Sequence, residues 1–278
     1  MTRAVTGAVY VGVIVGCIAG GQVWFWLLAT LLAMLGVDEL NRISNRNFMS
    51  TSMRLLDMIG AALGVTVTMG LSTGNGSLIT LGWLCLPGWL LYLMLRLIGQ
   101  LYVQDGNGLE HLAHSLMGQL YVVLPLAILN AIYLLDGKEL MLTIFIMIWL
   151  NDTGAFCVGS LMGKHRLFER ISPKKSWEGF FGGLAFCIAA GAGAYFLWGE
   201  GLHIPQLRNV WVMMALGATV SVFSTWGDLI ESLIKRSLGV KDSGKLLPGH
   251  GGILDRIDSL LLVAPAVSLL LTAAVTLL

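Results

Sequence analysis

The sequence predicts an all-α, polytopic integral membrane protein of about nine transmembrane helices, with a cytoplasmic N-terminus and the C-terminus on the opposite side. Three observations lead to this fold class. Of the 278 residues 56% are hydrophobic and 12% are charged, whereas soluble domains carry about 25% charged residues. Long apolar runs recur along the whole chain, as expected for helices that each cross a bilayer. All but two of the 17 Lys and Arg residues fall on one side of the expected membrane.

The order of the apolar segments gives the expected topology. The first two segments are short for a hydrocarbon core about 30 Å thick, since a helix rises about 1.5 Å per residue. The positive-inside rule leaves only Lys138 and Arg208 outside and favours an odd number of spans. We see neither an internal repeat nor a linker, so we expect a single membrane domain, with N-terminal helices in 1–150 and polar helices and cytoplasmic loops in 151–278. The expected spans are 4–20, 22–37, 57–72, 78–98, 115–135, 139–160, 180–199, 209–234 and 259–278.

Polar residues gather in three clusters in the second half of the chain, and the first lies inside the sixth expected span, in IMIWLNDTGAFCVG. A carboxylate in a bilayer costs about 2.5 to 3.5 kcal/mol on insertion scales, so Asp152 should face the bundle interior or a wet cavity. The alternative is that Asp152 only forms a hydrogen bond to a neighbouring helix, because Gly154 and Gly159 indicate close backbone approach.

The second cluster is the loop GKHRLFERISPKKSWEG, Gly163 to Gly179. Basic residues beside a membrane are commonly topology anchors or contacts for anionic lipids. However, Pro173 fixes the backbone just before Lys174 and Lys175, and a preorganised pair of lysines suits a polyphosphate. Both interpretations remain open for this loop.

The third cluster begins with STWGDLIESLIKR, in which Asp228, Glu231, Ser232 and Lys235 share one helix face by their spacing. These residues could form a salt-bridge ladder that neutralises itself. We favour a cation site with a lysine beside it for a phosphate, because such a stripe is not a packing seam.

The same cluster continues in KDSGKLLPGHGGILDRIDS, Lys241 to Ser259. Its glycines and proline predict a tight, irregular loop whose amides can approach a ligand closely. Asp255 and Asp258 follow, with Arg256 between them. Oxygen ligands without a Cys/His cluster favour a hard ion such as Mg²⁺, which substrate phosphates commonly complete. His250 is either a loop histidine with local partners or a phosphate or proton-transfer partner.

Together these clusters indicate phosphoryl or nucleotidyl transfer at a cytoplasm-facing membrane site, because such chemistry requires charge neutralisation and positioning. The sequence lacks a Walker A motif, a GxSxG elbow and an HExxH motif, which argues against an ATPase, a serine hydrolase and a zinc protease. The net charge of +1 says nothing about a nucleic-acid partner, and none is expected.

The segment SLIKRSLGVKDSGKLLPGHGGILDRID, Ser232 to Asp258, resembles the signature of the phosphatidate cytidylyltransferases, also called CDP-diacylglycerol synthases. Every fixed position of S-x-x-K-R-x₄-K-D-x-G-x₂-[apolar]-P-x-H-G-G-x-x-D-R-x-D is filled. NDTGAF, GKH and ISPKKSWEG are also similar to that family, with Ser176 where many members have Thr. The first 150 residues match only in their pattern of spans, plus Glu39 at the end of the second span.

The resemblance implies the reaction CTP + phosphatidate → CDP-diacylglycerol + pyrophosphate, a step of phospholipid biosynthesis at the cell inner (cytoplasmic) membrane. It implies that Asp228 and Asp255 hold a dinuclear metal centre beside Ser232, with Mg²⁺ and, as a candidate second ion, K⁺. Lys235 is expected to act at this centre as a phosphate-binding catalytic residue. Membrane lipids are expected partners, and the resemblance also suggests a homodimer. The expected substrate-binding residues are Lys174, Lys175, Ser232, Arg236, Lys241, His250 and Arg256, and further site candidates are Asp152, Glu231 and Asp258.

Two other function classes stay open at this point. Another CTP-dependent lipid or polyprenol transferase or kinase would use similar groups, although the D-G-x₂-A-R…G-x₃-D-x₃-D spacing of CDP-alcohol phosphotransferases is absent. A secondary transporter would also carry carboxylates within the membrane, but repeated halves with broken helices would be expected. His111 and His114 could bind a metal by their spacing, and an interfacial position explains them as well.

Overall fold

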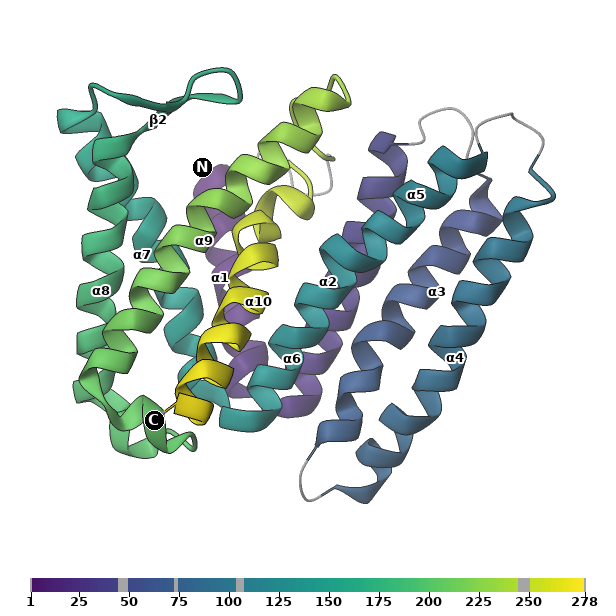
Figure 1. The fold of residues 1–278 in the computed structure, drawn as a ribbon, viewed down its shortest axis with the longest axis horizontal. Coiled ribbons are helices and arrows are strands. Elements are labelled where there is room, and N and C mark those ends of the chain that lie inside the picture. The colour runs from purple at the N-terminus through teal and green to yellow at the C-terminus, as the bar shows by residue number, and fades with distance from the viewer. Residues whose placement is uncertain (1, 45–49, 73–74, 104–107, 245–250, 278) are drawn as a thin grey trace. The chain divides into compact units, whose positions relative to one another are not determined.

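A computed structural model of the chain describes residues 2–44, 50–72, 75–103, 108–244 and 251–277. These residues are almost entirely helical, as Figure 1 shows. The elements are α1 (Thr2–Ala19), α2 (Gln22–Ser44), α3 (Thr51–Val67), the 3₁₀ helix η1 (Thr68–Leu71), α4 (Gly76–Gln100), α5 (Gly108–Gly118), the π-helical η2 (Gln119–Val123), α6 (Leu124–Asp136), α7 (Lys138–Met162), β1 (Arg166–Phe168), β2 (Ser172–Ser176), α8 (Trp177–Trp198), the 3₁₀ helices η3 (Gly199–Gly201) and η4 (Pro205–Arg208), α9 (Val210–Ser237) and α10 (Leu254–Leu277).

The described part of the chain has eight helical segments long and apolar enough to cross a membrane. Helices α5, η2 and α6 form one of them, Gly108–Asp136, and α1 adds a shorter apolar helix, Val5–Ala19. Each of the nine expected spans therefore coincides with a helix. The class of an all-α polytopic membrane protein is confirmed, whereas the number of spans and the N-in, C-out orientation stay predictions.

Helix α2 is longer than the apolar pattern indicated. The expected span ended at residue 37, but the helix continues to Ser44 and buries Asp38, Glu39 and Asn41. Hydropathy marks these three residues as a loop, although each finds partners within the protein. The helix thus continues several residues beyond the predicted apolar span.

The basic loop Gly163–Gly179 contains a short hairpin that the all-α expectation did not include. Strands β1 and β2 pair antiparallel, with Arg166 opposite Ser176. The Trp177 amide donates to the His165 carbonyl at 2.9 Å, which joins the hairpin to the start of α8. Figure 1 shows β2 leading directly into α8. Three basic residues of this loop, Arg166, Lys174 and Lys175, therefore lie on strands.

The chain divides into two compact units. Unit 1 comprises Met1–Leu134 and Asp242–Arg256, and unit 2 comprises Leu135–Lys241 and Ile257–Leu278. The expectation of one membrane domain, with its halves at 1–150 and 151–278, stays a prediction.

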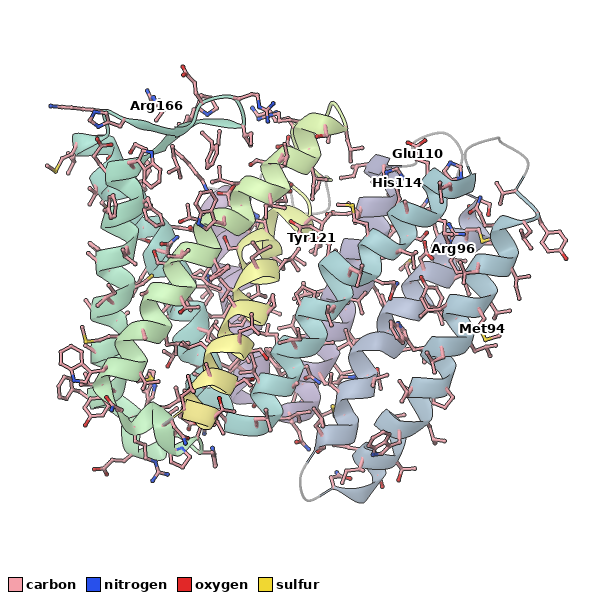
Figure 2. The ribbon with its side chains drawn as sticks, in the orientation of Figure 1. Met94, Arg96, Glu110, His114, Tyr121 and Arg166 are labelled. Carbon is pink, nitrogen blue, oxygen red and sulfur yellow. The ribbon has the colours of Figure 1, made fainter. Side chains whose placement is uncertain are left out.

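Unit 1 is held together by a buried polar cluster on α2 to α5. The Asp57 carboxylate accepts hydrogen bonds from Asn41, Tyr92 and Ser115 at 2.9, 3.0 and 2.7 Å. It also forms an ion pair with Arg96 at 3.2 Å, and both side chains have at most 1% exposure. Figure 2 labels Arg96 on α4. A charge inside a membrane protein requires such a partner, so this pair fixes how four helices pack.

Unit 2 is built on close contacts among α7, α8 and α9. A Cβ atom at Gly217 of α9 would collide with the Cys187 carbonyl of α8, and one at Gly191 would collide with the Met213 carbonyl. Small residues let helix backbones approach closely inside a bilayer. Across the α7–α9 contact, Asn151 accepts a hydrogen bond from the Ser221 hydroxyl at 2.7 Å. These contacts set the positions of the polar groups described next.

Candidate functional site

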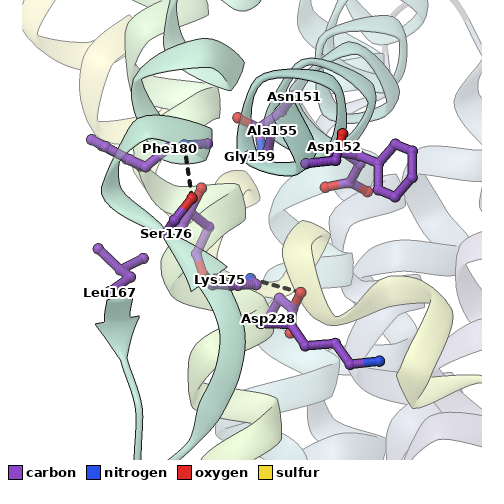
Figure 3. Close-up of a pocket in the computed structure, with 14 residues that line it drawn as sticks. Asn151, Asp152, Ala155, Gly159, Leu167, Lys175, Ser176, Phe180 and Asp228 are labelled. Atoms are coloured by element: carbon purple, nitrogen blue, oxygen red, sulfur yellow. Dashed lines mark hydrogen bonds and ion pairs between the residues drawn. The ribbon is translucent and has the colours of Figure 1, made fainter. Parts of the chain in front are cut away.

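Unit 2 contains a cavity of about 400 Å³ that is lined by α7, the hairpin, the first turns of α8, and α9. Figure 3 shows this pocket with the carboxylate of Asp228 facing the ammonium of Lys175. The first polar cluster, the basic loop and the third cluster all contribute to its wall. The polar residues that line it include Asn151, Asp152, Lys174, Lys175, Ser176, Thr225 and Asp228.

The central contact of the pocket is an ion pair between the hairpin and α9. Lys175 Nζ lies 2.7 Å from Asp228 Oδ2, and the same nitrogen lies 3.5 Å from the Thr225 carbonyl oxygen. The other carboxylate oxygen of Asp228 accepts a hydrogen bond from the Ser232 hydroxyl at 3.2 Å. The side chains of Lys175 and Asp228 are 26% and 37% exposed, so both remain accessible to a ligand.

Local sequence explains why Lys175 faces the pocket. Ser176 is the N-cap of α8, and its hydroxyl accepts a hydrogen bond from the Gly179 amide at 3.2 Å. Ser, Thr, Asp and Asn are favoured at this position because their oxygen satisfies an unpaired helix amide. A Cβ atom at Gly163 would lie 2.7 Å from the Ser176 hydroxyl oxygen, so glycine there leaves room for the cap. The capped helix start thereby fixes the residue before it.

The polar stripe on α9 separates into two pairs. Asp228 and Ser232 form one pair beside the pocket. Glu231 and Lys235 form a buried ion pair one turn apart, with side-chain exposures of 3% and 14%. Part of the stripe is thus a salt bridge between neighbours, as one interpretation of the sequence held. The ammonium of Lys235 is held by Glu231 rather than presented to the described pocket.

Further carboxyl groups interact with Asp228. Asp258 on α10 interacts electrostatically with Asp228, Asp152 and Lys175. The Asp258 carboxylate also accepts a hydrogen bond from the Ser259 amide at 2.6 Å. A Cβ atom at Gly227 would lie 2.7 Å from the Asp258 carbonyl oxygen, so α9 and α10 are in close contact here. Asp152 belongs to the first polar cluster of the sequence and Asp228 and Asp258 to the third, and unit 2 brings the two clusters together.

Asp255 lies in unit 1, in the first turn of α10. Its carboxylate accepts hydrogen bonds from the amides of Ser243 and Gly252 at 3.1 and 2.7 Å, and the Ser243 hydroxyl lies at 3.1 Å. Because Asp228 belongs to unit 2, their joint metal centre stays a prediction. Among the described residues, no group of three or more His, Cys, Asp or Glu side chains could hold a metal ion by itself.

Four further residues were expected to bind substrate. Arg236 and Lys241 are exposed on unit 2 and do not line the described pocket. Arg256 is half-buried in unit 1, and its carbonyl oxygen accepts a hydrogen bond from the Tyr10 hydroxyl at 3.0 Å. His250 lies outside the described residues.

Sequence reasoning gave no role to three residues that contact these groups. Ser221 and Ser224 of α9 contact Asn151 and place it beside the pocket, but serines in an apolar span carry little signal alone. Glu39 was noticed only as part of a resemblance. A carboxylate that is buried at the end of a span costs free energy unless it is paired. The position of Glu39 at a span end could therefore have indicated that polar partners lie close to it.

The fold is that of a multi-pass helical membrane protein, and its pocket is lined by both carboxylates and lysines. The chain belongs to the cytidylyltransferase family, whose family model matches residues 1–274. The family resemblance of its C-terminal motifs is thereby confirmed.

Three curated relatives illustrate this membership, and each is called phosphatidate cytidylyltransferase. The chain is 47% identical over 138 residues to the protein of Staphylococcus aureus strain COL, 45% over 136 residues to that of Staphylococcus haemolyticus strain JCSC1435, and 44% over 136 residues to that of Staphylococcus epidermidis strain ATCC 12228. Each match covers 49% of this chain and 50% of the relative. The chain thus spans about half the length of the curated relatives it matches.

Proposed function

We propose that this chain is a phosphatidate cytidylyltransferase, which transfers the cytidylyl group of CTP to phosphatidate and releases pyrophosphate. The observation that carries the proposal is the Lys175–Asp228 ion pair, which lines a pocket between membrane-spanning helices. A lysine suits the phosphates of both substrates, and an accessible carboxylate suits a cation bound between them. The family and the names of the relatives support the same activity.

In the proposed reaction, a phosphate oxygen of phosphatidate attacks the α-phosphorus of CTP. A new P–O bond forms as the bond from the α-phosphorus to the bridging oxygen breaks, and pyrophosphate leaves with that electron pair. A phosphate monoester is largely ionised near neutral pH, because its second pKa is about 6, so no strong general base is needed. The protein therefore contributes mainly positioning and charge neutralisation.

The proposed cofactor is Mg²⁺, with K⁺ as a candidate second ion, and the proposed ligands are Asp228, Asp255 and Ser232. The donor set fits, because carboxylate and hydroxyl oxygens are ligands for hard cations. The ammonium of Lys175 also lies against Asp228, which indicates that this carboxylate readily accepts a positive charge. Bound there, Mg²⁺ would offset the repulsion between two anionic substrates and stabilise the leaving pyrophosphate.

The basic residues are proposed to hold the phosphates. Lys174 and Lys175 lie on the pocket wall and are proposed to contact the triphosphate of CTP. Lys235 is a further candidate, since its pairing with Glu231 keeps the ammonium on the face of α9 that carries Asp228. Further proposed substrate contacts are Arg236, Lys241, His250 and Arg256, and Asp152 and Asp258 are proposed to shape the acidic part of the site.

The proposed location is the cell inner membrane, with the active site facing the cytoplasm. CTP would reach the site from the cytosol and phosphatidate from the lipid, which explains a polar pocket between apolar helices. A homodimer is proposed from the family resemblance.

A product assay tests the function directly. Purified protein in detergent–phosphatidate micelles receives Mg²⁺ and CTP labelled at the α-phosphate. CDP-diacylglycerol and pyrophosphate should appear in equal amounts. Release of CDP with a phosphorylated lipid would instead identify a CTP-dependent kinase, and absence of both products would reject the proposal.

A further inference from the structure

The buried carboxylate of Glu39, in unit 1, contacts Ser243 and Leu254, which precede and follow positions 245–250 in the sequence. Glu39 on α2 is 8% exposed. Its Oε2 atom accepts a hydrogen bond from the Leu254 amide at 2.9 Å and lies 3.0 Å from the Ser243 hydroxyl. Leu254 begins α10, and the N-terminus of a helix favours a negative charge. The Glu39 side chain therefore links α2 to the start of α10 and to Ser243.

The backbone around this carboxylate is shaped to admit it. A Cβ atom at Gly244 would overlap Glu39 Oε1, and one at Gly252 would overlap the same carboxylate and the Ser243 hydroxyl. Only glycine leaves this space open at both positions. The close approach of the Glu39 side chain thus accounts for two glycines of the segment, independently of any ligand.

The same group of residues holds Asp255. The Ser243 hydroxyl lies 3.0 Å from Glu39 and 3.1 Å from Asp255, and its single hydrogen can serve one carboxylate at a time. Each carboxylate also has backbone donors of its own, Leu254 for Glu39 and Gly252 for Asp255. Glu39 and Asp255 therefore share one hydroxyl, and each carboxylate also accepts from a backbone amide.

We propose that Glu39 is a positioning residue, whose buried carboxylate holds Ser243 and Leu254 together and so fixes the Asp255 carboxylate for metal binding. The last part of this inference rests on the proposed function, because it takes Asp255 as a ligand. Groups that orient a metal ligand commonly change metal affinity 10- to 100-fold when removed. Glu39 is expected to act in this indirect way and not on the substrates.

The first experiment needs neither metal nor activity. Hydrogen exchange is measured on the full-length protein in EDTA, for the wild type, Glu39→Ala and Glu39→Gln. The Leu254 amide should exchange about tenfold faster in Glu39→Ala, because its hydrogen bond to a charged group is lost. The Ser243 and Gly252 amides donate to Asp255, and they should also exchange about tenfold faster, because Asp255 is no longer held in place. Glu39→Gln should restore most of the protection, since its amide oxygen can still accept from Leu254.

Asp38→Asn provides the matched control. Asp38 is the preceding residue on α2 and is also buried, but it pairs with Arg42 and Arg54. This variant loses a neighbouring carboxylate and should leave the three amides unchanged. Equal exchange in the wild type and Glu39→Ala would overturn the proposal. If Glu39→Ala does not fold, Ser243→Ala is used, with an expected change of about threefold for the Gly252 and Leu254 amides.

The second experiment measures how cytidylyl transfer depends on Mg²⁺. The half-saturating Mg²⁺ concentration should rise about tenfold in Glu39→Ala, with the KM for CTP at saturating Mg²⁺ within about twofold of the wild type. Faster exchange with an unchanged Mg²⁺ dependence would overturn the positioning role. An inactive wild type with faster exchange in Glu39→Ala would reject the proposed function but retain the link between Ser243 and Leu254.

Discussion

The ammonium of Lys175 lies 2.7 Å from the carboxylate of Asp228. Fifty-three positions separate these residues in the sequence, and the contact joins the basic hairpin to α9 at the wall of one pocket. The basic hairpin and the charged face of α9 could each be explained as surface charge, but they line the same pocket. The pair places a lysine ammonium next to a carboxylate on the wall of this pocket.

The first prediction concerns Lys175 itself. Lys175→Met should lower kcat/KM about 100-fold, because it removes a positive charge aimed at the phosphates and leaves Asp228 without this partner. Lys175→Arg should retain part of the activity. The measurement is initial-rate formation of CDP-diacylglycerol at several CTP concentrations.

Lys174→Met is the matched control, since Lys174 is the adjacent residue of β2 and is exposed. Its substitution should cost about fivefold or less, as expected for a charge in contact with water. Equal losses in both variants would show that the Lys175–Asp228 contact has no special role.

The second prediction concerns the buried ion pair of unit 1. Arg96→Met should lower the free energy of unfolding by about 3 to 5 kcal/mol, because Asp57 is left as an uncompensated buried charge. The double variant Asp57→Asn/Arg96→Met should be less destabilised than Arg96→Met alone. Thermal unfolding in detergent measures both.

Arg42→Ala serves as the comparison for this pair. The Arg42 side chain is 62% exposed in its ion pair with Asp38, so its loss should cost about 1 kcal/mol or less. A similar cost for Arg96→Met would mean that the Asp57 cluster does not hold α2 to α5 together.

The third prediction concerns the packing of α8 on α9. Gly217→Ala should destabilise unit 2 by about 1 to 3 kcal/mol, since the added methyl group collides with the Cys187 backbone and the helices must separate. Gly193→Ala on α8 should be neutral or slightly stabilising, because no atom lies within 4 Å of its Cβ position. The melting temperatures of the two variants test this prediction. Equal melting temperatures would contradict the close α8–α9 contact.

Much of the fold could be predicted from composition, because a helix that crosses hydrocarbon needs about 20 apolar residues and each such run stands out. The pattern failed at the end of α2. Asp38 and Glu39 resemble loop residues by hydropathy, but distant partners such as Arg54 and Ser243 make their burial possible. The hairpin was also missed, because strands as short as β1 (Arg166–Phe168) leave no alternating pattern.

In the candidate site, contacts within one helix could be predicted from the sequence, whereas contacts between distant segments could not. Helical spacing correctly placed Asp228 near Ser232 and Glu231 near Lys235, because residues four apart are neighbours on a helix. No spacing rule could pair Asp228 with Lys175, since tertiary packing brings them together. The roles of these residues in binding metal and substrate stay predictions.

The fourth prediction tests the central claim, that Asp228 belongs to a metal-dependent cytidylyl transfer site. The measurement compares wild type and Asp228→Asn at saturating Mg²⁺, with CDP-diacylglycerol and pyrophosphate quantified in the same samples. The wild type should form both products in equal amounts, lose activity in EDTA and regain it with Mg²⁺. Asp228→Asn should be slower by about 1,000-fold while its melting temperature stays near that of the wild type. Near-normal turnover by Asp228→Asn, or wild-type turnover that persists in EDTA, would contradict the account.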